Sequence, residues 1–575
     1  MGHNRRGLIV MVLFILLVSV VFIAVVMIGN NTPGKTLADP EAYFGIENAN
    51  QMAVIVDNEI VGAQGCIING TAYVSYETVQ KYLNSRFYFD SNENLLLYTL
   101  PGATARAEAG SGRYTDGGAG GTLNHDVFVS DGGTIYIALD YVQLYTNIDF
   151  TTYESPSRTV ITKTWGTIQT ASVTRDTQVR TEMSVKSAIL EQVTAGESLR
   201  LVADNGKWAE VRTEDGYLGY IQKSRLSDAA DTEISRAFDE PVYTSLTRDH
   251  TINMAWHQVT SQTANNSLSD LISGASGLNT VAPTWFFILD TNGNIASLAS
   301  PSYVATARQA GIEVWADVND FDGQSLYGGI NSNDATYELL SYTSKRQNLE
   351  GQLISAALSA GVSGINIDFE KISSECGPHY IQFIREMSAL CRTNGLVLSV
   401  DSYVPSSWTT QYNRAEQGAV ADYVVIMAYD ENGDWSDAIG SNSSLTYVSE
   451  AIADTIKEVP AGKMILGIPF FTKLWKETSA SGSSQGGISC SSMGMEEAEA
   501  TLSAHSATIT WDDKTGQNFG TYTENGTIYS VWLEDEKSIA EKLNLMKQNG
   551  LAGSAAWKLG QEKSSIWAVI AGYMN

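Results

Sequence analysis

Cysteine is scarce in this sequence, with four residues among 575. So few thiols cannot build the disulfide framework that stabilises many small secreted domains. Cys376 and Cys391 flank residues 379–390, whose apolar spacing predicts a helix, and its length of about 20 Å keeps the two thiols too far apart for a disulfide. Cysteine and histidine show no metal-ligand spacing either. We therefore expect no metal site and no other cofactor.

Positive charge is also in short supply. Lysine and arginine number 36 against 64 aspartates and glutamates, which gives a formal net charge of -28. Nucleic acids and anionic lipids bind to basic patches, so this balance argues against nucleic-acid binding and against lipid binding by the folded part. A chain of 575 residues is also too long for a single core, and we expect three or four domains.

One long apolar run lies near the start of the sequence. Residues 8–28 carry no charge, and a helix of about 20 residues spans about 30 Å of hydrocarbon. Arg5 and Arg6 precede the run, while residues 29–34 lack a small-residue cleavage pattern, which favours a retained anchor over a cleaved signal peptide. We expect residues 1–30 to be a transmembrane anchor, single-pass in the cell membrane, with the C-terminal bulk extracellular.

An internal repeat follows a linker at residues 31–48. Within residues 49–165, a strand pattern at 70–77 leads through a short helix into two more strand patterns, and residues 133–140 restart the same order. The pattern resembles the N-terminal stalk domain of some copper amine oxidases. No histidine cluster accompanies it, so we infer no copper. We expect an α+β stalk that spaces the following domains from the membrane.

Residues 170–228 hold short alternating strands. Asn205-Gly206 and Asp215-Gly216 supply tight turns, and this pattern predicts a small β-barrel. The stretch resembles a bacterial Src-homology-3-like (SH3-like) domain, and the resemblance implies a cell-wall peptide as partner. Trp208 and Tyr220 are candidates for a peptide shelf, with core or rim packing as the alternative.

Strand patterns alternate with helical stretches over residues 241–575. Eight such strands in about 335 residues fit an α/β TIM (β/α)8 barrel, and no glycine-rich phosphate loop supports a doubly wound sheet. The candidate strands are residues 252–256, 284–288, 313–318, 364–370, 397–401, 423–427, 464–468 and 553–557.

The fourth candidate strand carries the sequence Gly-Ile-Asn-Ile-Asp-Phe-Glu at residues 364–370. Side chains alternate faces along a strand, so Asn366, Asp368 and Glu370 point one way and the apolar residues the other. Carboxylates at a buried strand end are costly, and general acid catalysis is one reason to keep them there; a solvated strand end is the alternative.

Further polar and aromatic residues fall at the carboxyl ends of later strands, where the active sites of barrels lie. Residues 427–430 read Met-Ala-Tyr-Asp, and Trp557 closes the last strand. Together with the fourth strand, these motifs resemble glycoside hydrolase family 18, whose fourth-strand signature is Asp-Gly-x-Asp-x-Asp-x-Glu. Ser363 and Asn366 stand where that signature has its first two aspartates.

The resemblance implies retaining hydrolysis of a β-linked N-acetylglucosamine unit, in which the substrate's own acetamido oxygen attacks the anomeric carbon. Glu370 would be the general acid and base, and its pKa would be raised by an anionic Asp368 and by partial burial. Asp368 would offset oxazolinium charge, and Tyr429 would hold the acetamido oxygen. The expected substrate-binding residues are Asp430, Met427, Trp557, Asn366 and Trp256.

Residues 477–529, between the last two predicted strands, are rich in serine, glycine and threonine. We interpret them as an insertion that either walls a cleft or stays mobile.

Taken together, these features predict a surface-anchored glycoside hydrolase. The anchor, stalk and SH3-like domain favour peptidoglycan as the glycan, with a chitinase or an endo-β-N-acetylglucosaminidase as the alternative enzyme. A non-catalytic glycan-binding cell-wall protein is the alternative from another class. The expected partners are a peptidoglycan or chitin-like glycan, a cell-wall peptide, and the membrane through the N-terminal helix.

Overall fold

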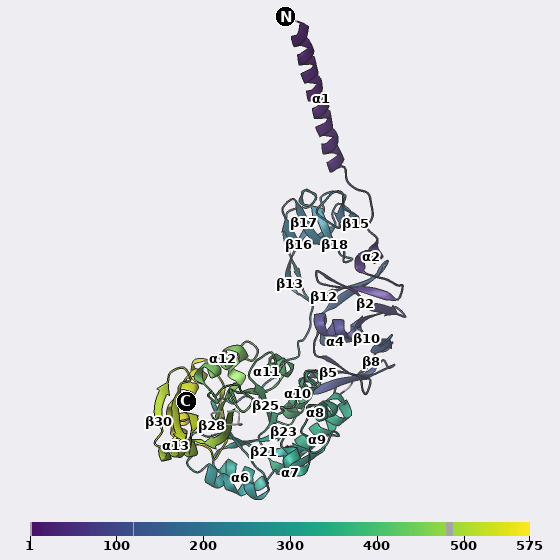
Figure 1. Ribbon diagram of the computed structural model, residues 1–575. Helices are drawn as coiled ribbons and strands as arrows, with labels where there is room; N and C mark the ends of the chain where they lie inside the picture. Colours follow the sequence, from purple (N-terminus) through teal and green to yellow (C-terminus); the bar gives the residue numbers. More distant parts are fainter. Residues whose placement is uncertain (1–2, 119, 479–486, 575) are drawn as a thin grey trace. The chain divides into compact units, whose positions relative to one another are not determined.

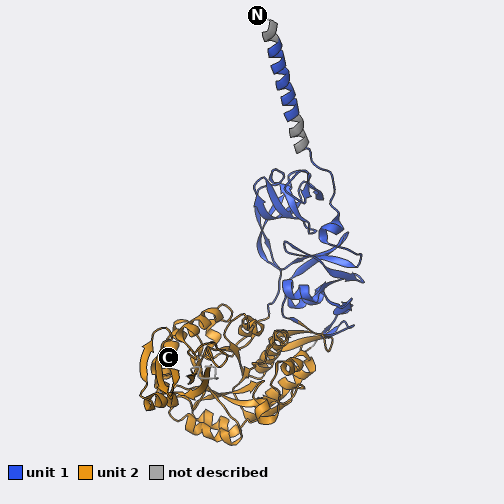
Figure 2. Cartoon of the chain, in the orientation of Figure 1, with its two compact units in different colours: residues 1–87, 107–114, 121–240 blue, residues 88–106, 115–120, 241–575 orange. Residues whose placement is uncertain are grey.

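The computed structural model describes residues 3–118, 120–478 and 487–574 (Figure 1). The chain forms two compact units, drawn blue and orange in Figure 2. The first contains residues 1–87, 107–114 and 121–240, and the second contains residues 88–106, 115–120 and 241–575.

Helix α1 (His3–Asn31) covers the predicted membrane anchor. In the part of the chain that the structure describes, however, no helix combines the length and the apolar character needed to cross a bilayer. The predicted transmembrane anchor, the membrane as a partner and the single-pass location in the cell membrane are corrected accordingly.

The stalk residues of the first unit build a seven-stranded sheet. In spatial order its strands are β11 (Asp149–Glu154), β12 (Ser157–Thr162), β1 (Gln51–Val56), β2 (Glu59–Ile68), β3 (Thr71–Ser75), β10 (Thr134–Ala138) and β9 (Phe128–Asp131). The repeat is visible in the element order. Strand β3 leads through α3 (Tyr76–Thr78) to β4 (Phe87–Asp90) and β5 (Leu95–Leu100), as β10 leads through α4 (Leu139–Tyr145) to β11 and β12.

The SH3-like residues form an antiparallel sheet of seven strands. In spatial order they are β15 (Ile189–Val193), β14 (Thr177–Arg180), β18 (Leu218–Gln222), β17 (Trp208–Arg212), β16 (Ser198–Asn205), β13 (Gly166–Ser172) and β19 (Ala230–Ile234). Its buried Val179, Val211 and Ile221 share one apolar cluster with Ile55 and Val160 of the stalk sheet. The two predicted domains therefore pack through a common core.

All eight predicted strands of the second unit are present, and they close into a parallel barrel. In spatial order they are β20 (Ile252–His257), β33 (Gly553–Trp557), β27 (Met464–Pro469), β26 (Tyr423–Met427), β25 (Val397–Tyr403), β24 (Gly364–Asp368), β23 (Glu313–Asn319) and β21 (Thr280–Ile288), and β20 pairs with β21. The helices between them include α6 (Pro301–Gln309), α8 (Asn333–Ser341), α9 (Thr343–Ala360), α10 (Gly377–Thr393), α11 (Arg414–Val420), α12 (Leu445–Thr455), α14 (Glu536–Gln548) and α15 (Ile566–Ala571). The TIM-barrel prediction is confirmed.

The insertion between β27 and β33 is a folded subdomain rather than a loop. Its antiparallel sheet has the order β29 (Gly487–Gly494), β28 (Phe471–Thr478), β32 (Thr527–Leu533), β31 (Gln517–Glu524) and β30 (Thr508–Asp512), with helix α13 (Met495–Ala504). Leu502 of α13 and Val531 of β32 are fully buried in its own small core. Residues 479–486 of the predicted insertion lie outside the described residues.

Residues 88–106 come from the middle of the predicted stalk but belong to the barrel's unit. Thr343 donates two hydrogen bonds to one oxygen of Asp90, from its backbone N–H (2.7 Å) and from its hydroxyl (2.6 Å) to Oδ2. Gln382 of α10 donates to Thr99 (2.9 Å), and Tyr88 Oη lies 2.6 Å from His379 Nδ1. These residues of β4 and β5 are therefore part of the barrel's structure.

Candidate active site

The candidate residues lie at the carboxyl ends of adjacent barrel strands. Ile365 and Ile367 of β24 face the apolar layer between strands and helices, which leaves Asn366 and Asp368 on the opposite face. Strand register brings Asn366 opposite Asp317 of β23 and opposite Ser399 of β25. The polar side chains of three neighbouring strands therefore meet inside the barrel.

Glu370 is half-buried and follows Asp368 on the same polar face, just beyond the end of β24. Tyr403 donates a hydrogen bond from its hydroxyl to Glu370 Oε2 at 2.7 Å. The backbone N–H groups of Glu370 and Lys371 donate to Asp320, which holds the chain after β24 in place. Burial is the largest cause that raises the pKa of Glu370, and the Tyr403 hydrogen bond opposes it. Such a carboxyl can keep a proton for transfer.

Asp368 is 6% exposed, and its Oδ1 has no hydrogen-bond partner among the described residues. Burial raises its pKa well above the ordinary value, followed by the like charges of Glu370, Asp401 and Asp317. Sequence reasoning assigned an anionic Asp368 the task of raising the pKa of Glu370. In the structure burial comes first for Glu370, and the like charges that follow are Asp430 and Asp322.

Asn366 links the strand to two other predicted positions. Its amide donates to Asp401 Oδ1 (2.8 Å) and to Ser399 (3.0 Å), and its Oδ1 accepts from the Trp256 indole N–H (2.9 Å). Trp256 is only 1% exposed and lies 6.0 Å from Trp557, measured between ring centroids. Trp256 therefore contacts Asn366 from within the core.

The remaining predicted residues lie beside these strand ends. Met427, Tyr429 and Phe471 form a small buried cluster against which Tyr403 and Trp557 pack. Burial and then Asp368 raise the pKa of Tyr429 well above its usual value. Asp430 is partly exposed and forms a 2.6 Å ion pair with Lys473. The structure thus joins all eight predicted site residues into one constellation.

Four polar residues of this constellation were missed by sequence reasoning: Asp317, Asp320, Asp401 and Tyr403. Asp317 and Asp401 sit at the ends of the third and fifth strands, on the same face as the barrel interior. The signal was present, because each follows the same period-two alternation as Asp368. Within the described residues, Asp317, Asp368 and Asp401 are also the group whose carboxylates lie near enough together to hold a metal ion.

Comparison with known proteins identifies two parts of the chain. The family profile described as "Glycosyl hydrolases family 18" matches residues 325–562. The profile described as "Bacterial dipeptidyl-peptidase Sh3 domain" matches residues 179–226. Both recognised regions agree with the resemblances found in the sequence.

Curated relatives align with the barrel half of the chain. The "Uncharacterized glycosylase YvbX" of Bacillus subtilis (strain 168) is 27% identical over 300 residues, which cover 51% of this chain and 84% of that protein. The "Cortical fragment-lytic enzyme" of the same organism is 27% identical over 248 residues, covering 41% of this chain and 56% of that protein. The chain thus matches little more than half the length of the second relative.

Solved structures share the fold. The C-terminal domain of a putative chitinase from Desulfitobacterium hafniense DCB-2 superposes with a TM-score of 0.51 at 18% identity and covers 57% of this chain and 100% of that one. The Bacillus cereus spore cortex-lytic enzyme SleL gives a TM-score of 0.50 at 20% identity, covering 67% and 90%. The profile matches and the glycosylase relatives show that the chain contains a glycosyl hydrolase family 18 domain within its barrel and a bacterial SH3 domain, and they support a glycoside hydrolase.

Proposed function

We propose that the barrel cleaves β-linked N-acetylglucosamine glycans, most directly peptidoglycan, by substrate-assisted retaining catalysis. The observation that carries the proposal is the half-buried Glu370, whose pKa is raised by burial and whose carboxylate is oriented by Tyr403. A carboxyl in this state can give a proton to a leaving oxygen and later take one from water. Asp368, buried beside it, has an oxygen free of protein partners.

In the proposed reaction Glu370 protonates the glycosidic oxygen while the substrate's acetamido oxygen attacks the anomeric carbon. Asp368 balances the positive charge of the oxazolinium ion, and Tyr429 holds the acetamido group through its hydroxyl. Glu370 then deprotonates the water that opens the oxazolinium ring. Trp557 offers a flat apolar face to the sugar's C–H surface.

Two features favour peptidoglycan over chitin. Curated relatives from three Bacillus species are named cortical fragment-lytic enzyme. The chain also carries a bacterial SH3 domain ahead of the barrel. Relatives named chitinase or endochitinase support the second candidate, a chitinase, which is separable by substrate.

The decisive experiment digests purified peptidoglycan and chitin oligomers with the whole chain and with Glu370→Gln, and identifies product ends by mass spectrometry. The amide has no proton to give, so turnover should fall by roughly 10²–10⁴-fold while glycan binding persists. Glu375→Gln, an exposed change in the following loop, is the matched control. Equal cleavage by wild type and Glu370→Gln, or binding without cleavage by both, contradicts the hydrolytic role of this site and supports a glycan-binding one.

The stereochemistry of the first product tests the mechanism separately. Acetamido participation passes through two inversions and so retains the β configuration. Proton NMR of early products, recorded before mutarotation, should therefore detect the β-anomer. A first-formed α-anomer rules out the substrate-assisted route.

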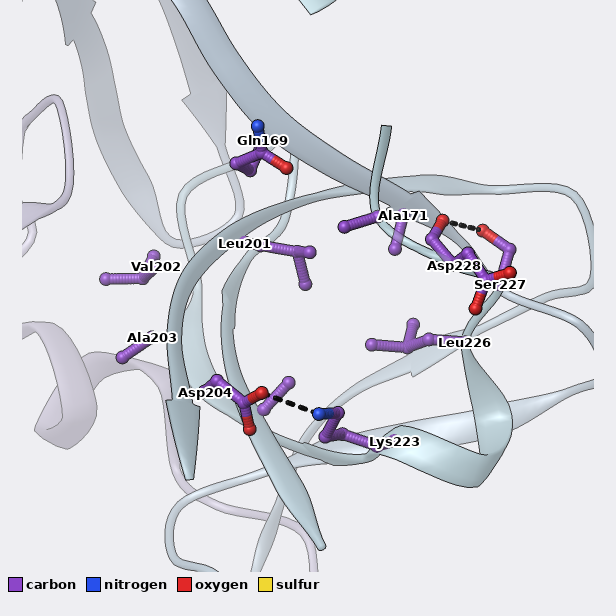
Figure 3. Close-up of a pocket in the computed structure, with 12 residues that line it drawn as sticks. Gln169, Ala171, Leu201, Val202, Ala203, Asp204, Lys223, Leu226, Ser227 and Asp228 are labelled. Carbon is purple, nitrogen blue, oxygen red and sulfur yellow. Dashed lines mark hydrogen bonds and ion pairs between the residues drawn. The ribbon is translucent and has the colours of Figure 1, made fainter. Parts of the chain in front are cut away.

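We further propose that the SH3 domain binds a short cell-wall peptide in the cavity of about 420 Å³ that Figure 3 shows. Leu201 and Leu226 supply apolar walls, while the Asp204–Lys223 ion pair and Asp228 offer charge of both signs for the ends of a peptide. Titration of a peptidoglycan stem peptide by calorimetry should give binding that Leu226→Asp abolishes. Unchanged binding by Leu226→Asp contradicts this location.

A further inference from the structure

Three buried carboxylates meet at the base of the candidate site. Asp317, Asp368 and Asp401 come from β23, β24 and β25, and each has an oxygen within 4.8 Å of the others. They are 0%, 6% and 1% exposed. Water therefore cannot screen the charges that these groups would carry if all were ionised.

The hydrogen bonds around these three residues leave oxygens unpaired. Asp401 Oδ1 accepts from Asn366, and Asp317 Oδ1 accepts a longer bond of 3.3 Å from Asn319. Asp317 Oδ2, Asp368 Oδ1 and Asp401 Oδ2 have no partner among the described residues. Buried anionic oxygens without donors cost several kcal/mol, whereas a proton shared between two carboxylates supplies the missing donor.

Neighbouring acids are the charges with the largest effect on the titration of the trio. Besides its own members, they are Asp320 and Asp322 after β23 and Glu370 after β24. The carboxylates in turn raise the pKa values of Tyr380 of α10, Tyr403 of β25 and Tyr429 after β26. Burial raises the pKa of Asp401 to about 8 and the pKa values of Asp317 and Asp368 well above their usual range.

We infer that Asp317 and Asp401 replace the carboxylate that the family signature has at position 366, and that they hold the proton which Asp368 releases during catalysis. The inference rests on the proposed function and extends it. As positive charge develops on the substrate, the O–H bond of Asp368 breaks and an O–H bond forms on Asp401 or Asp317. The reverse transfer follows when the oxazolinium ion is hydrolysed, so no proton is gained or lost.

The hydrogen bond between Asn366 and Asp401 makes it possible to test whether Asp401 replaces the carboxylate of position 366. The amide and the carboxylate face each other at 2.8 Å, so exchanging the two side chains keeps one amide, one carboxylate and the bond between them. Asp317 and Asp401 act through Asp368 and are therefore positioning residues. The double variant Asn366→Asp/Asp401→Asn should return the proton-holding carboxylate to β24.

The first experiment measures the pH–rate profile on peptidoglycan. Asp401→Asn should lower kcat by about 100-fold and displace a limb of the pH–rate profile, because it changes the charge state of Asp368. KM should change little, because Asp401 does not contact the glycan. The exchange variant should recover to within about tenfold of wild type. Asp437→Asn, an exposed change in the loop after β26, is the control and should match wild type.

The second experiment needs no substrate. Infrared spectra of the folded chain at pH 7 should contain a protonated-carboxyl absorption that Asp401→Asn reduces and Asp437→Asn does not. Because the folded trio binds protons that the unfolded chain has released above about pH 4, the barrel's unfolding temperature should fall as pH rises from about 4 to about 8. Asp401→Asn should make that fall shallower.

These measurements separate the inference from the proposed function. If wild type cleaves no glycan, the proposed function fails, whatever the spectra contain. If wild type cleaves and Asp401→Asn keeps the same kcat, pH profile and infrared absorption, the proton-holding role fails while the hydrolase stands. A stoichiometric divalent cation that leaves the protein on Asp401→Asn substitution also overturns the inference, because the trio would then be a metal site. Circular dichroism of each variant verifies that it is folded.

Discussion

Two sets of buried carboxylates in the barrel differ in their partners. Glu534, before α14, accepts two hydrogen bonds from Lys542 at 2.8 Å, one from Ser538 and one from Gln517. Asp317, Asp368 and Asp401, at the base of the candidate site, each keep one carboxylate oxygen without a hydrogen-bond partner among the described residues. A buried acid with a full set of partners stabilises one structure, whereas acids that share too few partners are poised to exchange protons.

Residues 88–106 of the barrel's unit, which include β5 and which we call the hairpin, hold a buried carboxylate of the first kind. Asp90 is fully buried and accepts from Thr343 twice on one oxygen, and from the N–H groups of Asn92 and Glu93 on the other. Arg346, also fully buried, pairs with Glu386 at 3.0 Å. The Thr343 bonds connect residues 88–106 to α9, and the Arg346–Glu386 pair connects α9 to α10.

The largest expected effect on stability comes from removing the cation of the first set. Lys542→Met leaves Glu534 buried and unpaired, and should lower the free energy of unfolding of the barrel by about 3–5 kcal/mol. Urea denaturation followed by tryptophan fluorescence measures this loss. Lys547→Met, exposed in the same helix, should change little, and Lys542→Met/Glu534→Gln should recover part of the loss. A loss below about 1 kcal/mol would contradict this expectation, because it would mean that an unpaired Glu534 costs little stability.

A smaller loss is expected at the hairpin. Asp90→Ala removes the acceptor of four N–H and O–H groups, of which those of Asn92 and Glu93 are only part-buried and can be satisfied by water, so the net cost should be about 1–3 kcal/mol. The same denaturation experiment applies, with the exposed neighbour Ser91→Ala as control. Equal stability of the two variants would show that residues 88–106 contribute nothing to the barrel.

The smallest expected effect is on turnover, and it tests whether Glu370 is the general acid. Tyr403→Phe removes a hydrogen bond that lowers the pKa of Glu370, so that pKa should rise and the alkaline limb of the pH–rate profile should move to higher pH. Turnover should fall about tenfold, in line with a lost charge-assisted hydrogen bond of about 1.5 kcal/mol. Tyr447→Phe, in α12, is the control, and a limb that stays in place or moves to lower pH would contradict the role of Tyr403 in orienting Glu370.

Local periodicity explains why much of the fold was predictable. Each barrel strand is a run of alternating or wholly apolar residues, and this signal survives without tertiary information, so all eight strands were found. The folded subdomain at 471–533 is harder to predict from local patterns, because the predicted insertion at 477–529 is rich in serine, glycine and threonine, which are also typical of loops. The transmembrane prediction also came from composition alone, and no helix among the described residues meets the requirement.

The sequence by itself determined the barrel strands, the recognised family and the ladder that ends in Asp368 and Glu370, because each of these is written in residues close together along the chain. Only the tertiary structure decided that Asp317 and Asp401 stand beside Asp368 and that Asp90 is an acceptor for Thr343. These neighbours are separated by 33 to 253 residues, and their meeting depends on barrel closure and hairpin packing, which local patterns do not encode. The missing carboxylate of the family signature is therefore visible as an absence in the sequence, while the acids standing next to that position become visible only once the strands pair.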